Sequence, residues 1–119
     1  MLLSIAELAA QAASSIRTLC ADSAHKECGQ HPDALIIDVR EPLECQQNPI
    51  QGSINIPRGI LEAALPLQVQ DPHHPIYLHC ASGMRATLAA EQLTRQGYTR
   101  VSVIHAPLDA INKARSEDR

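Results

Sequence analysis

The chain has 119 residues and carries 10 Lys or Arg against 13 Asp or Glu, a net charge of −3. This length suits one compact domain and excludes a two-domain enzyme. The hydrophobic fraction of 45% predicts a folded core, which must be aliphatic because the chain has two Tyr, no Phe and no Trp.

Charge and hydropathy also limit the partners. An acidic chain lacks the basic stripe with which proteins bind nucleic-acid phosphates. No run of residues approaches the roughly 18 apolar residues of a membrane span, and residues 1–13 lack the basic start of an export signal and include Glu7. We therefore expect a cytoplasmic protein without a nucleic-acid or membrane partner, whose four cysteines are reduced thiols.

The sequence begins with a helix signal. Ser4 and Glu7 have the spacing of a capping box, and four apolar residues then share one helical face: Ile5, Leu8, Ala9 and Ala12. We assign residues 1–15 to an N-terminal helical extension and residues 16–119 to the domain proper.

The domain opens with two short elements. Residues 16–19 read as a first strand, and Asp22 can cap a short helix that Gly29 stops. Cys28 and His31 have the spacing of zinc ligands, but a second such pair is missing, so we do not expect a metal.

Four later runs are apolar, rich in β-branched residues and too short for helices, as buried parallel strands are. They are Leu35–Val39, Ile54–Ile56, Ile76–Leu78 and Val101–Ile104. Between the last two, Met84–Gln96 has the composition of a helix and ends at Gly97. Strand, helix and strand in succession predict an α/β fold with a parallel sheet and right-handed crossovers.

The segment with reactive chemistry is the strand, tight loop and helix that contain Cys80. Cys80 falls at the carboxyl end of a strand, where α/β sheets bind ligands. Gly83 lets backbone N–H groups turn inward, the helix directs its positive end at the sulfur, and Arg85 adds a cation. All three favour the thiolate, although thiolate formation alone gains only about threefold in rate. The loop must therefore also bind an anionic donor.

Purely structural roles for Cys80 and Arg85 are also consistent with the sequence. Cys80 is also consistent with a buried cysteine that only packs, and Arg85 with a surface residue of the first helical turn. An Arg at a helix N-terminus opposes the helix dipole, however, and this placement hints at an anion nearby.

Three segments in order resemble the single-domain rhodaneses. They are Asp38-Val39-Arg40-Glu41-Pro42-Leu43-Glu44, Gly52-Ser53-Ile54-Asn55-Ile56-Pro57 and Cys80-Ala81-Ser82-Gly83-Met84-Arg85. The resemblance covers residues 16–112 and implies a five-stranded parallel sheet flanked by helices. It also implies a sulfurtransferase without metal or organic cofactor, in which a catalytic cysteine takes sulfane sulfur from thiosulfate or a persulfide.

The resemblance assigns roles to single residues. Cys80 is the nucleophile that carries the persulfide, and the substrate-binding loop is Ala81, Ser82, Gly83, Met84 and Arg85. Asp38 and Arg40 brace this loop, or are merely structural. Arg58 attracts the anionic donor, or is an exposed loop residue. The acceptor is a thiol or a protein such as thioredoxin.

The chain departs from the family pattern in two places. Asn48-Pro49-Ile50-Gln51-Gly52 replaces Gly-His-Ile-Pro-Gly, and Ala106-Pro107 and Ile111 replace the usual Gly-Gly and Trp. These changes affect the pocket wall and the C-terminal packing, and they leave the nucleophile loop intact.

Two rival functions remain. The related dual-specificity phosphatases have one more residue between Cys and Arg than the four found here, so this loop suits sulfur better than a phosphoryl group. A non-catalytic rhodanese-like binding module is the other rival, although such modules often lose the cysteine. If the chain is an enzyme, Cys20, Cys28 and Cys45 are dispensable.

Overall fold

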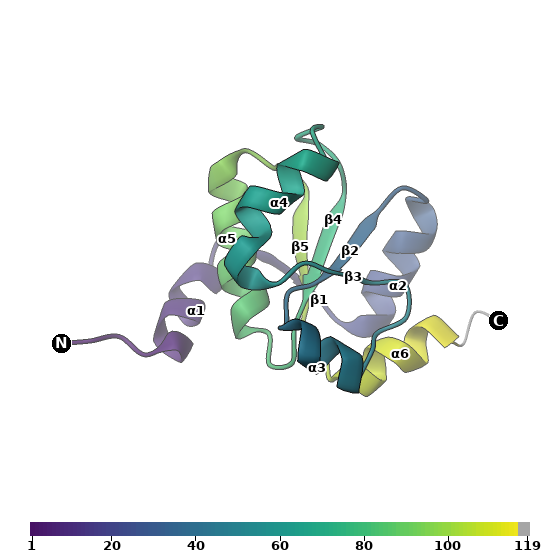
Figure 1. Ribbon diagram of the computed structural model, residues 1–119, viewed down its shortest axis with the longest axis horizontal. Coiled ribbons are helices and arrows are strands. Elements are labelled where there is room, and N and C mark those ends of the chain that lie inside the picture. Colours follow the sequence, from purple (N-terminus) through teal and green to yellow (C-terminus); the bar gives the residue numbers. More distant parts are fainter. Residues whose placement is uncertain (117–119) are drawn as a thin grey trace.

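The computed structural model describes residues 1–116, and its centre is a single sheet of five parallel strands (Figure 1). The strands lie in the order β1-β5-β4-β2-β3. Their bounds are β1 Arg17–Leu19, β2 Leu35–Asp38, β3 Ile54–Asn55, β4 Ile76–His79 and β5 Val101–Ile104. The parallel sheet flanked by helices that the sequence predicts is confirmed, and all five expected strands are present.

Helices cover both faces of the sheet (Figure 1). One face carries α1 (Ile5–Ala13), α4 (Leu61–Gln68) and α5 (Met84–Gln96), and the other carries α2 (Ala21–Gln30) and α6 (Leu108–Ser116). Two short elements follow strands at their carboxyl ends: α3 (Pro42–Gln47) after β2, and the 3₁₀ helix η1 (Arg58–Ile60) after β3. None of the helices among residues 1–116 has the length and apolar character needed to cross a bilayer.

The strands are buried on both faces, so that neighbouring residues pack into two separate clusters. Ile37, Leu78 and Val103 face α4 and α5. On the opposite face, Ile36, Tyr77 and Ile104 contact α2 and α6, together with Ile111, which stands where the family has Trp. The expected aliphatic core is confirmed.

Helix α1 begins with the predicted capping box, in which Ser4 Oγ accepts a hydrogen bond from the Glu7 amide at 3.1 Å. Its contact with the domain is narrower than the pattern suggests. Ala9 and Ala12 are buried, whereas Ile5 and Leu8 are 50% and 43% exposed. The two alanines of the predicted apolar face are therefore buried, while its two larger residues stay about half exposed.

Helix α2 differs slightly from its prediction. It starts at Ala21 with Cys20 as the N-cap residue, not at Asp22, and it continues through Gly29 to Gln30. The glycine has a right-handed conformation, so it does not end the helix. Helices α3, α4 and α6 carry no individual prediction from the sequence.

Candidate active site

Cys80 follows β4 directly and lies beneath the loop that leads into α5. Its Sγ accepts hydrogen bonds from the backbone amides of Gly83 at 3.1 Å and Ala86 at 3.4 Å. The residue is 1% exposed. The sequence predicts amides that point at the sulfur, and two do so. Such donors can stabilise negative charge that develops on sulfur during a reaction.

Gly83 shapes this loop. It is the N-cap residue of α5 and has a left-handed backbone with φ of 87°. A Cβ there would also lie 2.8 Å from Cδ2 of His105. The left-handed turn therefore favours glycine, and any larger residue would also require the His105 side chain to move. Sequence analysis missed His105 because it lies 22 residues further on.

The N-terminal helix contributes to the surroundings of the loop. A hollow of about 270 Å³ lies between α1 and the loop, and its walls include Ala6, Ala9, Ser82, Met84 and His105. Residues 1–15 were expected to be an extension of the domain. In the structure α1 borders the candidate site, while the domain boundary at residue 16 stays a prediction.

The Arg85 side chain forms an ion pair with Glu44. Its guanidinium donates to both carboxylate oxygens of Glu44 in α3, at 2.7 and 2.9 Å. These two hydrogen bonds lower the pKa of Glu44 to about 2 and raise the pKa of Arg85. Arg85 therefore ties the start of α5 to α3. Sequence analysis gave Glu44 no role, although it closes the first family motif.

Asp38 and Arg40 form a buried ion pair at the end of β2, the neighbour of β4. Arg40 Nη2 lies 2.6 Å from Asp38 Oδ2, and its Nε bonds both carboxylate oxygens at 3.0 Å. Burial alone would raise the pKa of Asp38, but the bonds from Arg40 outweigh it and the pKa is lowered. Arg40 also donates to the Asn48 and Glu44 carbonyls. The pair thus holds α3, which in turn holds Arg85.

Arg58 lies in η1, and its amide donates to the Val39 carbonyl at 3.0 Å. Its guanidinium donates to Glu62 at 2.6 Å. The charge that was expected to attract an anionic donor is therefore paired with a carboxylate one helical turn away.

His79 precedes the nucleophile and predicts a pH dependence of stability. It is fully buried, its Nε2 lies 2.7 Å from Ser53 Oγ, and its Nδ1 has no hydrogen-bond partner among the described residues. Burial lowers the pKa of His79 from 6.5 to about 4. The unfolded chain thus binds this proton at higher pH than the native chain. The free energy of unfolding should fall by up to about 3 kcal/mol as the pH drops from 6.5 to 4.

Urea unfolding at pH 7 and pH 4.5 measures this loss. His79→Gln removes the titrating group, so the variant should lose less stability over the same interval. Asp38 does not obscure the result. Because its pKa is lowered, its stabilising effect on the native state is lost only when the carboxyl is protonated, below about pH 4. An equal loss in both proteins would contradict the prediction.

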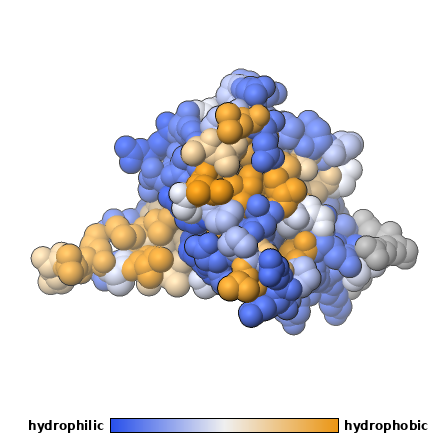
Figure 2. Space-filling model, in the orientation of Figure 1, coloured by the Kyte–Doolittle hydropathy of each residue, from blue (hydrophilic) through white to orange (hydrophobic). Residues whose placement is uncertain are grey.

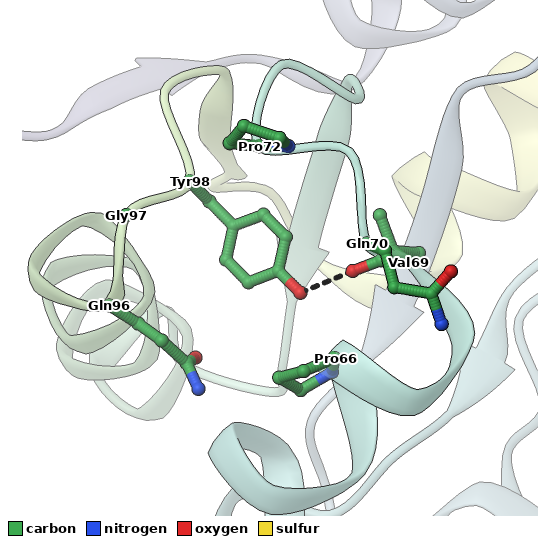
Figure 3. Close-up of a pocket in the computed structure, with 7 residues that line it drawn as sticks. All are labelled: Pro66, Val69, Gln70, Pro72, Gln96, Gly97 and Tyr98. Atoms are coloured by element: carbon green, nitrogen blue, oxygen red, sulfur yellow. Dashed lines mark hydrogen bonds between the residues drawn. The ribbon is translucent and has the colours of Figure 1, made fainter.

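A second hollow, of about 320 Å³, lies far from Cys80 at the amino ends of the strands (Figure 3). Pro66 and Val69 line one side, and Gly97 and Tyr98 line the other. The Tyr98 hydroxyl points across it but already donates to the Val69 carbonyl at 2.6 Å. This hollow contains no nucleophile or charged group, and we do not assign it a role in catalysis.

Known proteins share this sequence pattern. The family model described as the rhodanese-like domain matches residues 21–114 of this chain. The chain is 37% identical over 65 residues to the thiosulfate sulfurtransferase PspE of Escherichia coli, covering 55% of this chain and 62% of PspE. It is 36% identical over 90 residues to the rhodanese domain-containing protein CG4456 of Drosophila melanogaster, covering 66% and 81%. It spans 55% of a putative mitochondrial thiosulfate sulfurtransferase of Schizosaccharomyces pombe.

Two solved structures extend the likeness. One is a protein of unknown function from Rhodopseudomonas palustris, described as a possible tyrosine phosphatase, with 30% identity, a TM-score of 0.79 and coverage of 96% of this chain and 92% of that one. The other is an Escherichia coli rhodanese with anions, with 33% identity, a TM-score of 0.59 and coverage of 66% and 91%. With its sheet, its cysteine loop and the family match over most of its length, this chain belongs to the rhodanese-like domain family.

Proposed function

We propose that this protein is a sulfurtransferase that carries sulfane sulfur as a persulfide on Cys80. The observation that carries the proposal is the pair of amides, from Gly83 and Ala86, that donate to the Cys80 sulfur. They stabilise the thiolate that attacks and the thiolate that leaves, so one arrangement serves both halves of the reaction. Relatives named sulfurtransferases support the same chemistry.

The reaction has two displacements. The Cys80 thiolate attacks the outer sulfur of the donor, forming a new S–S bond while the donor's own bond to that sulfur breaks. The leaving sulfite or thiolate keeps the electron pair. The acceptor, a thiol or a protein such as thioredoxin, then attacks the outer sulfur of the persulfide, and Cys80 leaves again as a thiolate. Neither step needs a proton relay or an external redox partner.

A phosphatase is the weaker proposal despite the likeness to the Rhodopseudomonas palustris protein. Phosphoryl transfer by a cysteine loop uses the loop arginine to bind two phosphate oxygens. Both of the Arg85 donors that would do so are bonded to Glu44. A binding module without activity remains the third alternative, and only the chemistry of Cys80 separates it from an enzyme.

Intact-mass measurement after incubation with thiosulfate or an organic persulfide tests the proposal. We expect a gain of one sulfur, about 32 Da, that maps to the Cys80 peptide and disappears when a thiol acceptor is added. A chain that gains no sulfur from any donor is a binding module. Turnover of an aryl phosphate without sulfur loading would indicate a phosphatase. The cytoplasmic location expected from the sequence remains part of the proposal.

A further inference from the structure

The start of the chain concentrates exposed apolar surface. Eight large apolar residues are exposed among residues 1–116, and five of them lie in the first eight positions. These five, which we call the N-terminal patch, are Met1, Leu2, Leu3, Ile5 and Leu8. Figure 1 shows that this end of the chain projects from the body of the molecule, and Figure 2 shows hydrophobic surface along it.

Helix α1 has apolar side chains around most of its circumference. Its polar residues are Glu7 and Gln11, which are four residues apart and therefore share one face. The domain buries only Ala9 and Ala12, where α1 packs against α5. A helix with so narrow a polar face is normally covered on more than one side. The fold of a single chain supplies one cover and leaves the N-terminal patch without another.

The area of the patch is large for a monomer. Its exposed fractions run from 43% at Leu8 to 95% at Leu2, and Met1 is completely exposed, which amounts to roughly 500 Å² of apolar surface. Monomeric proteins rarely expose more than a few hundred Å² in one apolar patch. Two such patches in contact would bury about 1,000 Å², the size at which specific interfaces begin. This area suits two chains that associate weakly.

The charges of the segment favour a second copy over other occupants. Helices that lie on a membrane surface present Lys and Arg to the lipid headgroups, and residues 1–16 contain neither. The carboxylate of Glu7 accepts a hydrogen bond from the Ser4 amide at 3.1 Å, so it is bonded to the start of its own helix. The patch thus offers no charge to an acidic or basic partner. A second copy brings the same uncharged surface, and a two-fold axis lets each patch cover the other.

We propose that the N-terminal patch is a dimer interface, covered by the same patch of a second copy of this chain. The inference does not depend on the proposed sulfurtransferase function. It does bear on the candidate site, because α1 forms one wall of the hollow that Ser82 and Met84 line on the other side. The dimer therefore holds in place the helix that borders the nucleophile loop.

Sedimentation equilibrium of the full chain, from about 1 to 500 µM, tests the proposal. We expect a monomer–dimer equilibrium with a dissociation constant between about 1 and 100 µM, as a small interface without charged pairs implies. The double variant Leu2→Gln with Leu3→Gln should raise this constant at least about tenfold, because it removes four leucines from the dimer. Both positions precede the Ser4 cap, so α1 should still form, and circular dichroism checks this.

Leu43→Gln with Leu67→Gln is the matched control. These leucines are 67% and 80% exposed and lie on α3 and α4, outside the patch. The control should keep the dissociation constant of the wild type within about twofold. An equal weakening in both double variants would show that general surface hydrophobicity drives the association, and would overturn the inference.

Two other results would overturn it as well. A wild-type chain that stays monomeric over the whole range has no such interface. A dimer that Leu2→Gln with Leu3→Gln leaves intact uses another face. If the monomeric wild type instead binds vesicles of phosphatidylcholine and phosphatidylglycerol, and this double variant does not, then lipid is the occupant of the patch and not a second copy.

Discussion

Cys80→Ser is expected to abolish sulfur transfer, lowering kcat/KM by at least about 10³-fold while the fold remains intact. A serine hydroxyl is un-ionised at neutral pH and does not form a persulfide. Its oxygen can still accept hydrogen bonds from the Gly83 and Ala86 amides that now reach the sulfur. Thiocyanate formation from a sulfur donor and cyanide measures the activity, and circular dichroism with a thermal melt checks the fold.

Cys20→Ser is the matched control, because Cys20 is the strongest rival for sulfur attachment. Cys20 is exposed, and a hydrogen bond with Ser23 Oγ at 3.2 Å lowers the pKa of its thiol. Exposure and acidity favour reaction with added reagents, but the two amides that stabilise a sulfur anion in the loop lie at Cys80. Activity within about twofold of wild type is expected for Cys20→Ser. Loss of activity in this variant, with activity retained in Cys80→Ser, would contradict the assignment.

The parts of the fold that follow from local sequence signals were predicted well. Helix α5 spans Met84–Gln96 and strand β5 spans Val101–Ile104, both with the expected bounds. A continuous apolar run specifies a strand buried on both faces, and Gly97, with φ of 123°, ends the helix as its position predicts. These signals depend on residues close in sequence, so a single sequence is enough to read them.

Helix α4 shows what such signals miss. Pro66 lies inside it, and a proline removes one amide from the helical ladder, so the segment does not look helical. The Glu62 carbonyl that this amide would have bonded instead accepts a hydrogen bond at 2.8 Å from Gln96 Nε2 of α5. The compensating donor is 34 residues away, and only the packing of α4 against α5 brings it there.

The residues of the candidate site also fall into those that the local sequence predicts and those that only the fold brings together. The cysteine, glycine and arginine of the loop are recognisable because they follow one strand in a fixed order. The carboxylate that binds Arg85 comes from α3, 41 residues earlier, and its role depends on β2 and β4 being neighbours. The partner of Arg58 is different, since Glu62 lies four residues on, a spacing that brings side chains together on a helix. That spacing alone could have predicted that Glu62 neutralises the charge of Arg58.

Arg40→Met is expected to lower the free energy of unfolding by about 3–5 kcal/mol, because it leaves the Asp38 carboxylate buried without its cation. The two side chains are 2% and 3% exposed, so water cannot replace the lost partner. Urea unfolding at pH 7 measures the change. Arg58→Met is the control: its pair with Glu62 is 29% and 38% exposed, and its loss should cost less than about 1 kcal/mol.

The double variant Asp38→Asn with Arg40→Met separates charge from packing. Asparagine removes the unpaired charge and still accepts the bond from the Arg40 backbone amide, so the double variant should be more stable than Arg40→Met alone. Equal stabilities would show that the cost lies in the other contacts of Arg40, the carbonyls of Glu44 and Asn48. Those carbonyls lie in α3 and at its C-cap, and α3 positions Glu44 against Arg85. Because neither variant restores these bonds, both should transfer sulfur more slowly than wild type even where they are fully folded.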